Sequence, residues 1–126
     1  MRVVDTSAWI EYLAETQWGE RVAAELPRRD SWLVPTIVQL ELAKWLRRTR
    51  DESAAEAVMA FYETCVVADL DSDIALAAAD IAVRHKLATA DAIVYATARA
   101  HRADVLTCDR HFEGLLGVHF IAKHDA

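Results

Sequence analysis

Four acidic side chains are predicted at the ends of strands or on apolar faces of helices, and together they could hold a divalent cation. Two of them follow short β-type runs: Asp5 comes after residues 2–4, and Asp109 comes after residues 105–107. In open parallel sheets, ligands bind beyond the carboxyl ends of the strands, which is where both carboxylates would stand. Each is also compatible with a plain helix N-cap, because aspartate is common at that position.

Glu41 is predicted to lie on the apolar face of a helix. At 3.6 residues per turn, Ile37, Glu41 and Trp45 share one face. An unpaired charge on such a face is expensive to bury. A bound cation would remove that cost, and a salt bridge to an arginine or a place at the core margin is the alternative.

Asp91 presents the same anomaly in the first turn of another helix. The residues that follow it, up to Ala100, are apolar almost all round, which predicts a buried helix. Thr89 is the expected N-cap, so Asp91 is not needed for capping. Acids suit helix N-termini, which is the simple explanation, but a buried carboxylate still needs a partner.

Such a set of hard oxygen ligands favours Mg²⁺ or Mn²⁺ over zinc. The histidines form no HExxH pattern and are each expected at the surface or the core boundary, His124 included, and Cys65 and Cys108 form no CxxC pair. A pair of metal ions held by carboxylates suits phosphodiester hydrolysis, in which no Ser or Cys nucleophile is required. Three glycines make neither a P-loop nor a GxGxxG turn.

Strands that alternate with helices must position these acids. Short apolar runs predict strands at residues 2–4, 32–34, 66–68, 105–107 and 118–121. Helices are expected at 8–14, 18–26, 36–50, 52–64, 72–85 and 89–102, with a short turn at 110–115. The expected N-caps are Thr6 or Ser7, Thr36, Asp71 or Ser72, and Thr89. This alternation predicts an α/β protein with a parallel sheet covered by helices.

The bulk composition sets further bounds. The chain has 126 residues, 54% of them hydrophobic, which predicts a single domain over 1–126 with a real core. A net charge of −6 argues against a simple basic DNA-binding module, but not against an acidic pocket whose bound metal reverses the local charge. The unpaired cysteines fit a reducing cytoplasm, and no apolar run predicts a signal peptide or a membrane span.

Four short motifs resemble one known family. They are Val3-Val4-Asp5-Thr6-Ser7, Leu40-Glu41-Leu42, Leu87-Ala88-Thr89-Ala90-Asp91-Ala92 and Thr107-Cys108-Asp109-Arg110-His111-Phe112. Each is weak alone, but their order and spacing along essentially the whole chain are similar to those of PIN-domain proteins, specifically the VapC toxins of type II toxin–antitoxin pairs.

The resemblance implies a three-layer α/β/α fold with a mostly parallel sheet of about five short strands. It implies a Mg²⁺- or Mn²⁺-dependent endoribonuclease that forms homodimers in the cytoplasm and is neutralised by a cognate antitoxin, which would reach the pocket with a basic side chain. The four acids, Asp5, Glu41, Asp91 and Asp109, occupy the family's catalytic and metal-binding positions, the last often acting through water. The hydroxyls of Thr6, Ser7 and Thr107 would orient those carboxylates or a metal-bound water.

Basic and aromatic residues suggest where partners would bind. Five residues flank the segments that carry Asp91 and Asp109, and they are candidate RNA contacts: Arg84, Lys86, Arg99, Arg102 and Arg110. Their simple alternative is solvation of helix faces. Trp9 and Trp45 are expected in the core, whereas Trp18 and other residues on the early helices could instead form a groove for an antitoxin helix or a dimer contact.

A signalling receiver domain is the main alternative function. Asp5 would belong to its acidic pocket, Asp69 or Asp71 would be the phosphoacceptor, Thr107 the switch residue and Lys123 the late lysine. Receivers use two adjacent acids after the first strand, however, and they give no reason for Glu41 and Asp91. A PIN-like binding module without activity is the third possibility, which Mg²⁺-dependent RNA cleavage would exclude.

Overall fold

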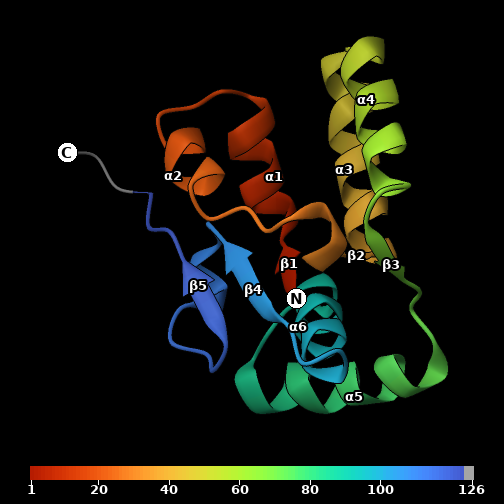
Figure 1. Cartoon of the computed structure of the whole chain (residues 1–126). Helices are drawn as coiled ribbons and strands as arrows, with labels where there is room; N and C mark the ends of the chain where they lie inside the picture. The colour runs from red at the N-terminus through yellow and green to blue at the C-terminus, as the bar shows by residue number, and fades with distance from the viewer. Residues whose placement is uncertain (124–126) are drawn as a thin grey trace.

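A five-stranded, all-parallel sheet runs through the centre of the protein, which a computed structural model describes over residues 1–123 (Figure 1). The strands are β1 (Arg2–Val4), β2 (Trp32–Pro35), β3 (Val66–Ala68), β4 (Asp104–Thr107) and β5 (Val118–Phe120). They lie in the order β3-β2-β1-β4-β5. The prediction of an α/β protein with a parallel sheet is therefore confirmed.

Helices fill the connections between strands. They are α1 (Thr6–Leu13), α2 (Gly19–Ala23), α3 (Thr36–Thr49), α4 (Glu52–Tyr62), α5 (Ser72–His85) and α6 (Thr89–Ala100), with 3₁₀ turns η1 (Arg29–Ser31) and η2 (Arg110–Phe112). The chain moves outward from β1 to β3 through α1–α4, then returns across the sheet to β4 through α5 and α6. Because parallel crossovers are right-handed, the outward and return legs place their helices on opposite faces. The result is the expected three-layer α/β/α architecture.

The core lies on both faces of the central strands. Val3 and Val4 of β1 and Val105 and Leu106 of β4 are at most 1% exposed, and residues 92–98 of α6 are all buried. The expectation of strands that are apolar and covered on both faces fails at the two edges of the sheet: Val66 of β3 is 38% exposed, and β5 carries the exposed His119. An edge strand has a neighbour on one side only, so its covering layers end there.

The starts of three helices differ from the sequence prediction. The N-cap positions of α1, α3 and α6 are held by Asp5, Pro35 and Ala88, and none of these three caps with its side chain. Threonine or serine was expected at each. At the starts of α1 and α3, the hydroxyls make other hydrogen bonds. The Thr36 hydroxyl accepts from the amide of Leu70 at 3.3 Å. The hydroxyls of Thr6 and Ser7 donate to carboxylates. The Thr89 hydroxyl has no corresponding explanation.

Aspartate side chains cap two other helices, and one of them, Asp71, is an expected cap. Asp51 caps α4, and Asp71 caps α5 by accepting from the amide of Ile74 at 2.9 Å. At the other end, α6 stops before Arg102, which adopts a left-handed φ of 54°. Within residues 1–123, no helix combines the length and apolar character that crossing a membrane requires.

Candidate functional site

The chain changes direction across the sheet between β1 and its neighbour β4, and the candidate site lies beyond the carboxyl ends of these two strands. Asp5 directly follows β1, and its amide donates to the carbonyl of Leu106 in β4 at 2.9 Å. Asp109 comes two residues after the end of β4. This is the switch point at which open α/β sheets bind ligands.

Two hydroxyls hold the carboxylate of Asp5 in place. Ser7 Oγ and Thr107 Oγ1 both donate to Asp5 Oδ2, each at 2.9 Å. Since each hydroxyl has one proton and donates it to Asp5, its oxygen is left to accept. Ser7 Oγ accepts from the amide of Cys108 at 3.0 Å, and Thr107 Oγ1 accepts from the amide of Asp109 at 2.9 Å. The backbone after β4 therefore orients both hydroxyls toward Asp5.

Asp5 is a buried carboxylate that does not act as a helix cap. It occupies the N-cap position of α1, but its side chain makes no capping hydrogen bond, and it is 4% exposed. Desolvation by burial raises its pKa to about 6. The charges of Glu41 and Asp109 also raise this pKa, whereas the hydrogen bonds from the two hydroxyls lower it. The capping explanation for Asp5 therefore fails.

Glu41 approaches the first turn of α1 from α3. Its Oε1 accepts from Thr6 Oγ1 at 2.9 Å, and this bond joins the first turn of α1 to the middle of α3. No salt bridge to an arginine involves Glu41 within residues 1–123, so that explanation of its place on an apolar face is not supported. Its negative charge contributes to the raised pKa values of both Asp5 and Asp91, so the charges of these three carboxylates oppose one another.

Asp91 completes the group from the first turn of α6. Its carboxylate is half-buried and makes no hydrogen bond or ion pair with another described side chain. Its pKa is raised to about 6, first by desolvation and then by the charges of Asp109, Asp5 and Glu41. A helix N-terminus alone would lower the pKa of an acid. Burial and neighbouring acids therefore outweigh the helix dipole here.

Asp109 serves two purposes at the start of η2. Its Oδ1 accepts from the backbone amide of His111 at 2.9 Å and contacts His111 Nδ1 at 2.7 Å. The N-cap explanation is therefore correct for this residue, but it uses one oxygen only. One ligand atom each from Asp91, Asp109 and His111 lies within 4.8 Å of the others, a spacing that a single cation could bridge.

The structure thus brings all four predicted acids together and adds His111, which the sequence prediction did not include. Its only signal in the sequence is a position two residues after Asp109, on the turn that this aspartate caps. The backbone amides of Cys108 and Asp109, which fix the hydroxyls, carry no sequence signal at all. His124 lies outside the described residues.

The five basic candidates divide into two groups. Arg84 and Lys86 are exposed at the end of α5, just before the turn of α6 that carries Asp91. Arg110 is exposed beside Asp109, near Glu113 (3.7 Å) and over the ring of Phe120.

The structure does not bring the other two basic candidates to the acids. Arg99 lies eight residues after Asp91 on α6, which is about 12 Å along the helix axis. It lies against Gly117, the residue before β5 begins. Arg102 lies further on, two residues before β4 starts. Closeness in sequence to Asp91 is misleading here, because α6 runs along the strands, so its first turn lies at their carboxyl ends and its last turn at their amino ends.

The receiver alternative does not fit this topology. Asp69 follows β3, an edge strand that β2 separates from β1, whereas in receivers of order 2-1-3-4-5 the third strand lies next to the first. Asp71 is used as the cap of α5. Lys123 pairs with Glu11 at 2.8 Å.

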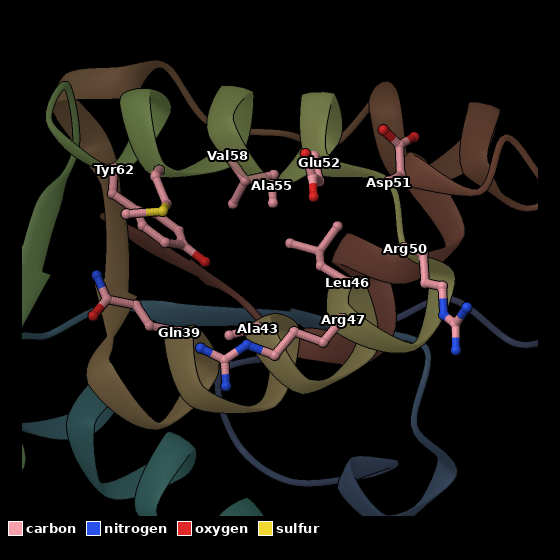
Figure 2. Close-up of a pocket in the computed structure, with 11 residues that line it drawn as sticks. Gln39, Ala43, Leu46, Arg47, Arg50, Asp51, Glu52, Ala55, Val58 and Tyr62 are labelled. Atoms are coloured by element: carbon pink, nitrogen blue, oxygen red, sulfur yellow. The ribbon is translucent and has the colours of Figure 1, made fainter.

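A groove between α3 and α4 is separate from the acids. Figure 2 shows Leu46 of α3 and Val58 and Tyr62 of α4 facing each other across it, with Arg47 and Arg50 on the α3 side. The groove has a volume of about 490 Å³ and contains none of the four predicted acids. Its apolar lining suits packing against another chain better than chemistry.

Solved structures show where this fold has been seen before. A toxin–antitoxin complex from Klebsiella pneumoniae aligns with a TM-score of 0.80 at 23% identity, covering 96% of this chain and 100% of that chain. VapC20 of Mycobacterium tuberculosis, a sarcin–ricin loop cleaving toxin, aligns with a TM-score of 0.74 at 24% identity, covering 94% and 98%. DNA-bound VapBC from Salmonella typhimurium aligns with a TM-score of 0.69 at 19% identity, covering 95% and 96%.

At these identities the likeness concerns the fold, and no curated protein matches the sequence. The family model of the PIN domain matches residues 2–115, a span that includes all four acids and the hydroxyls of the pocket. The chain belongs to the PIN domain family.

Proposed function

We propose that the protein is a metal-dependent endoribonuclease, the toxin of a toxin–antitoxin pair, that acts in the cytoplasm as one domain. The observation that carries the proposal is that four carboxylates gather beyond the carboxyl ends of β1 and β4 and interact through their charges, with no arginine or lysine paired to any of them among residues 1–123. Membership of the PIN family and the fold shared with VapC20, a toxin that cleaves RNA, support it.

The residues fit a divalent cation. Asp5 Oδ1 and the Asp91 carboxylate accept no hydrogen bond within the described chain, and both acids have pKa values raised to about 6. A bound cation would offset that excess of negative charge. Asp5, Glu41, Asp91 and Asp109 would hold Mg²⁺ or Mn²⁺, the ions that oxygen ligands favour. When bound, such an ion lowers the pKa of a water and stabilises charge on a phosphate.

The chain's own groups would keep the carboxylates in position before substrate arrives. Ser7 and Thr107 fix the orientation of Asp5, and Thr6 fixes that of Glu41. These bonds reduce the freedom that the side chains would otherwise lose on binding a cation. Three basic residues lie at the same end of the strands as the acids, and there they would contact RNA phosphates: Arg84, Lys86 and Arg110.

Cleavage of a structured RNA tests the proposal. The purified chain, stripped of metal, should cleave only after Mg²⁺ or Mn²⁺ is added, and EDTA should stop it. Asp5→Asn should reduce the rate by more than about a hundredfold, because loss of a residue that merely supports a ligand already costs about 10–100-fold. Asp104→Asn, at the opposite end of β4, is the matched control and should cleave normally. Cleavage that persists in EDTA would overturn the proposal.

The antitoxin would bind in a groove between α1 and α4. Its lining is apolar and aromatic, with one arginine: Trp9, Tyr12, Leu13, Leu26, Arg29, Trp32, Ala54, Ala57, Val58 and Phe61. Such a surface suits the apolar face of a partner helix, with an acidic side chain near Arg29. A basic side chain of the same antitoxin would reach the acidic pocket.

Two Ala→Glu substitutions, one in each groove beside α4, test this assignment. Ala57→Glu places a charge in the groove between α1 and α4, whereas Ala43→Glu places it in the groove between α3 and α4. We expect Ala57→Glu to weaken antitoxin binding by more than about tenfold, because a buried unpaired charge is costly, and Ala43→Glu to have little effect. The reverse result would move the antitoxin to the groove of Figure 2.

A homodimer would bury the exposed face of α5. Leu76 and Val83 are 71% and 82% exposed, and they lie seven residues apart on one face of that helix. Light scattering should give the mass of a dimer, and the double variant Leu76→Glu/Val83→Glu should give that of a monomer. Leu116→Glu, at an equally exposed leucine in a loop, is the control.

A further inference from the structure

Glu11 is a buried acid that lies outside the group of four. It is on α1, six residues after Asp5, and only 8% of it is exposed. Lys123 Nζ donates to its Oε1 at 2.8 Å, and the Thr16 hydroxyl donates to its Oε2. Desolvation by burial opposes the charged form, but the hydrogen bonds from Lys123 and Thr16 keep the pKa of Glu11 below its ordinary value. Unlike Asp5, this buried carboxylate is compensated by the protein itself.

The cation that compensates Glu11 lies on the segment that follows β5. Lys123 is 112 positions away from Glu11 in the sequence, so this ion pair joins two distant parts of the chain. Two residues before Lys123, Ile121 is 3% exposed, and its amide donates to the carbonyl of Thr107 at 2.8 Å. The segment of residues 121–123 is therefore bonded to the end of β4 through Ile121 and to α1 through Lys123.

The end of β4 to which this segment is bonded is also the part of the chain that orients Asp5. The Thr107 hydroxyl donates to Asp5. The amide of Cys108 donates to Ser7 Oγ, and Ser7 donates in turn to Asp5. Ser7 and Glu11 lie four residues apart on the same face of α1. That face therefore holds the end of β4 at Ser7 and the segment after β5 at Glu11.

We propose that Glu11 and Lys123 are positioning residues for Asp5. Their ion pair fastens the segment after β5 to α1, and that segment then holds the end of β4 where its amides and hydroxyl orient Asp5. A buried ion pair adds little stability compared with apolar residues of the same size, so stability alone does not account for it. What it supplies is a fixed geometry. This inference rests on the proposed function and adds two residues that make no hydrogen bond to the four acids within residues 1–123.

Amide hydrogen exchange of the metal-free, full-length chain tests this coupling without any measurement of activity. Lys123→Met should speed exchange of the Cys108 and Ile121 amides about tenfold more than exchange of the amides between β1 and β2, because only the end of β4 is released. Lys123→Arg keeps a cation that can pair with Glu11 and should restore slow exchange. Arg2→Met breaks an ion pair at the opposite end of β1 and is the matched control, in which Cys108 should not exchange selectively.

Cleavage kinetics measure the functional consequence. Lys123→Met should lower kcat about tenfold, the lower end of what a supporting residue contributes, with KM for RNA changed by less than about twofold, and Lys123→Arg should cleave normally. Equal acceleration at all amides, no acceleration at Cys108, no rescue by arginine, or a normal kcat in Lys123→Met would overturn the positioning role alone. Natural protein that does not cleave RNA with Mg²⁺ or Mn²⁺ would overturn the proposed function, and hydrogen exchange would still decide whether the segment is coupled to the end of β4.

Discussion

The two ends of the same pair of strands carry charge in opposite ways. At the start of β1 and β4, Arg2 donates to both oxygens of Asp104, at 2.8 and 3.0 Å, and also contacts Glu25 at 3.3 Å. At the carboxyl end of the same strands, Asp5 and Asp109 approach each other and no arginine or lysine pairs with either within residues 1–123.

The pKa values follow this difference. Hydrogen bonding to Asp104 raises the pKa of Arg2, so the surroundings of Arg2 stabilise its charged form. Desolvation raises the pKa of Asp5 to about 6, so its charge is disfavoured where it stands. A compensated cluster stabilises the fold, whereas an uncompensated one is kept at a cost to stability that a ligand would offset. The comparison separates a structural charge cluster from a functional one on the same two strands.

Short of replacing one of the acids, the largest expected effect comes from removing the hydroxyls that hold Asp5. Ser7→Ala together with Thr107→Val should reduce RNA cleavage by about 10–100-fold, because Asp5 would lose both donors and its fixed orientation. Metal-dependent cleavage rates measured beside circular dichroism would show this. A matched pair far from the pocket, Ser53→Ala with Thr64→Val, should cleave at the normal rate. Full activity in the Ser7 and Thr107 double variant would mean that orientation of Asp5 is unimportant.

A smaller effect is expected in the stability of the metal-free protein. Asp5 and Asp91 have pKa values near 6 in the folded state and an ordinary value of 3.8. The folded state therefore binds more protons between about pH 4 and 6, and the contribution of these groups to stability is lost as the pH rises through that range. In EDTA, the free energy of unfolding at pH 7.5 should lie about 1–2 kcal/mol below that at pH 5, after allowance for solvent around Asp91.

Asp91→Asn isolates this effect, because the Asp91 carboxylate accepts no hydrogen bond from residues 1–123. The variant should be more stable than the natural protein at pH 7.5 in EDTA, and its stability should change less between pH 5 and 7.5. Denaturant unfolding at both pH values gives the two differences. A variant that is less stable at pH 7.5 would show that the negative charge of Asp91 is compensated after all.

The opposite end of the sheet should respond in the opposite sense. Arg2→Met removes a compensating charge that is 22% exposed, and it should lower the free energy of unfolding by about 1 kcal/mol without changing cleavage per folded molecule. Arg28→Met, whose ion pair with Asp30 is exposed, is the control and should have almost no effect. A loss of activity in Arg2→Met that exceeds the loss of folded protein would contradict a purely structural role for the charge cluster at the start of β1 and β4.

The smallest effects are expected among the basic residues. Arg84→Gln with Lys86→Gln should weaken RNA binding a few-fold and reduce its salt dependence, because each residue that contacts a phosphate releases about one counterion. Arg99→Gln with Arg102→Gln should change neither, since both residues lie toward the far edge of the sheet. RNA binding measured at several salt concentrations distinguishes the two double variants. Equal effects would contradict the placement of RNA at the end of the strands that carries the acids.

The elements and the acids were predictable because each leaves a local signal. Apolar runs such as Val3–Val4 and Val105–Leu106 indicate central strands, and Glu41 and Asp91 are conspicuous as carboxylates in apolar helix faces. The N-caps were not predictable in the same way. Thr6 and Ser7 are good caps by residue type, but their hydroxyls bond to carboxylates that only the folded chain brings near.

Distances across the fold were also hidden from the sequence. Ser7 and Thr107 meet at 3.1 Å although a hundred residues separate them, whereas Asp91 and Arg99 are close in sequence and far apart in space. His111 lacks the spacing of a usual metal motif, and its position beside Asp109 depends on a turn that this aspartate caps. Contacts made between elements therefore required the structure.

Thermal unfolding with and without Mg²⁺ at pH 7.5 tests most directly whether the carboxylates share a cation. The natural protein and Asp104→Asn should each gain stability when the ion is added, because the ion binds only the folded chain, and Asp91→Asn should gain much less. Equal gains in the natural protein and both variants, or no gain in any of them, would contradict the account.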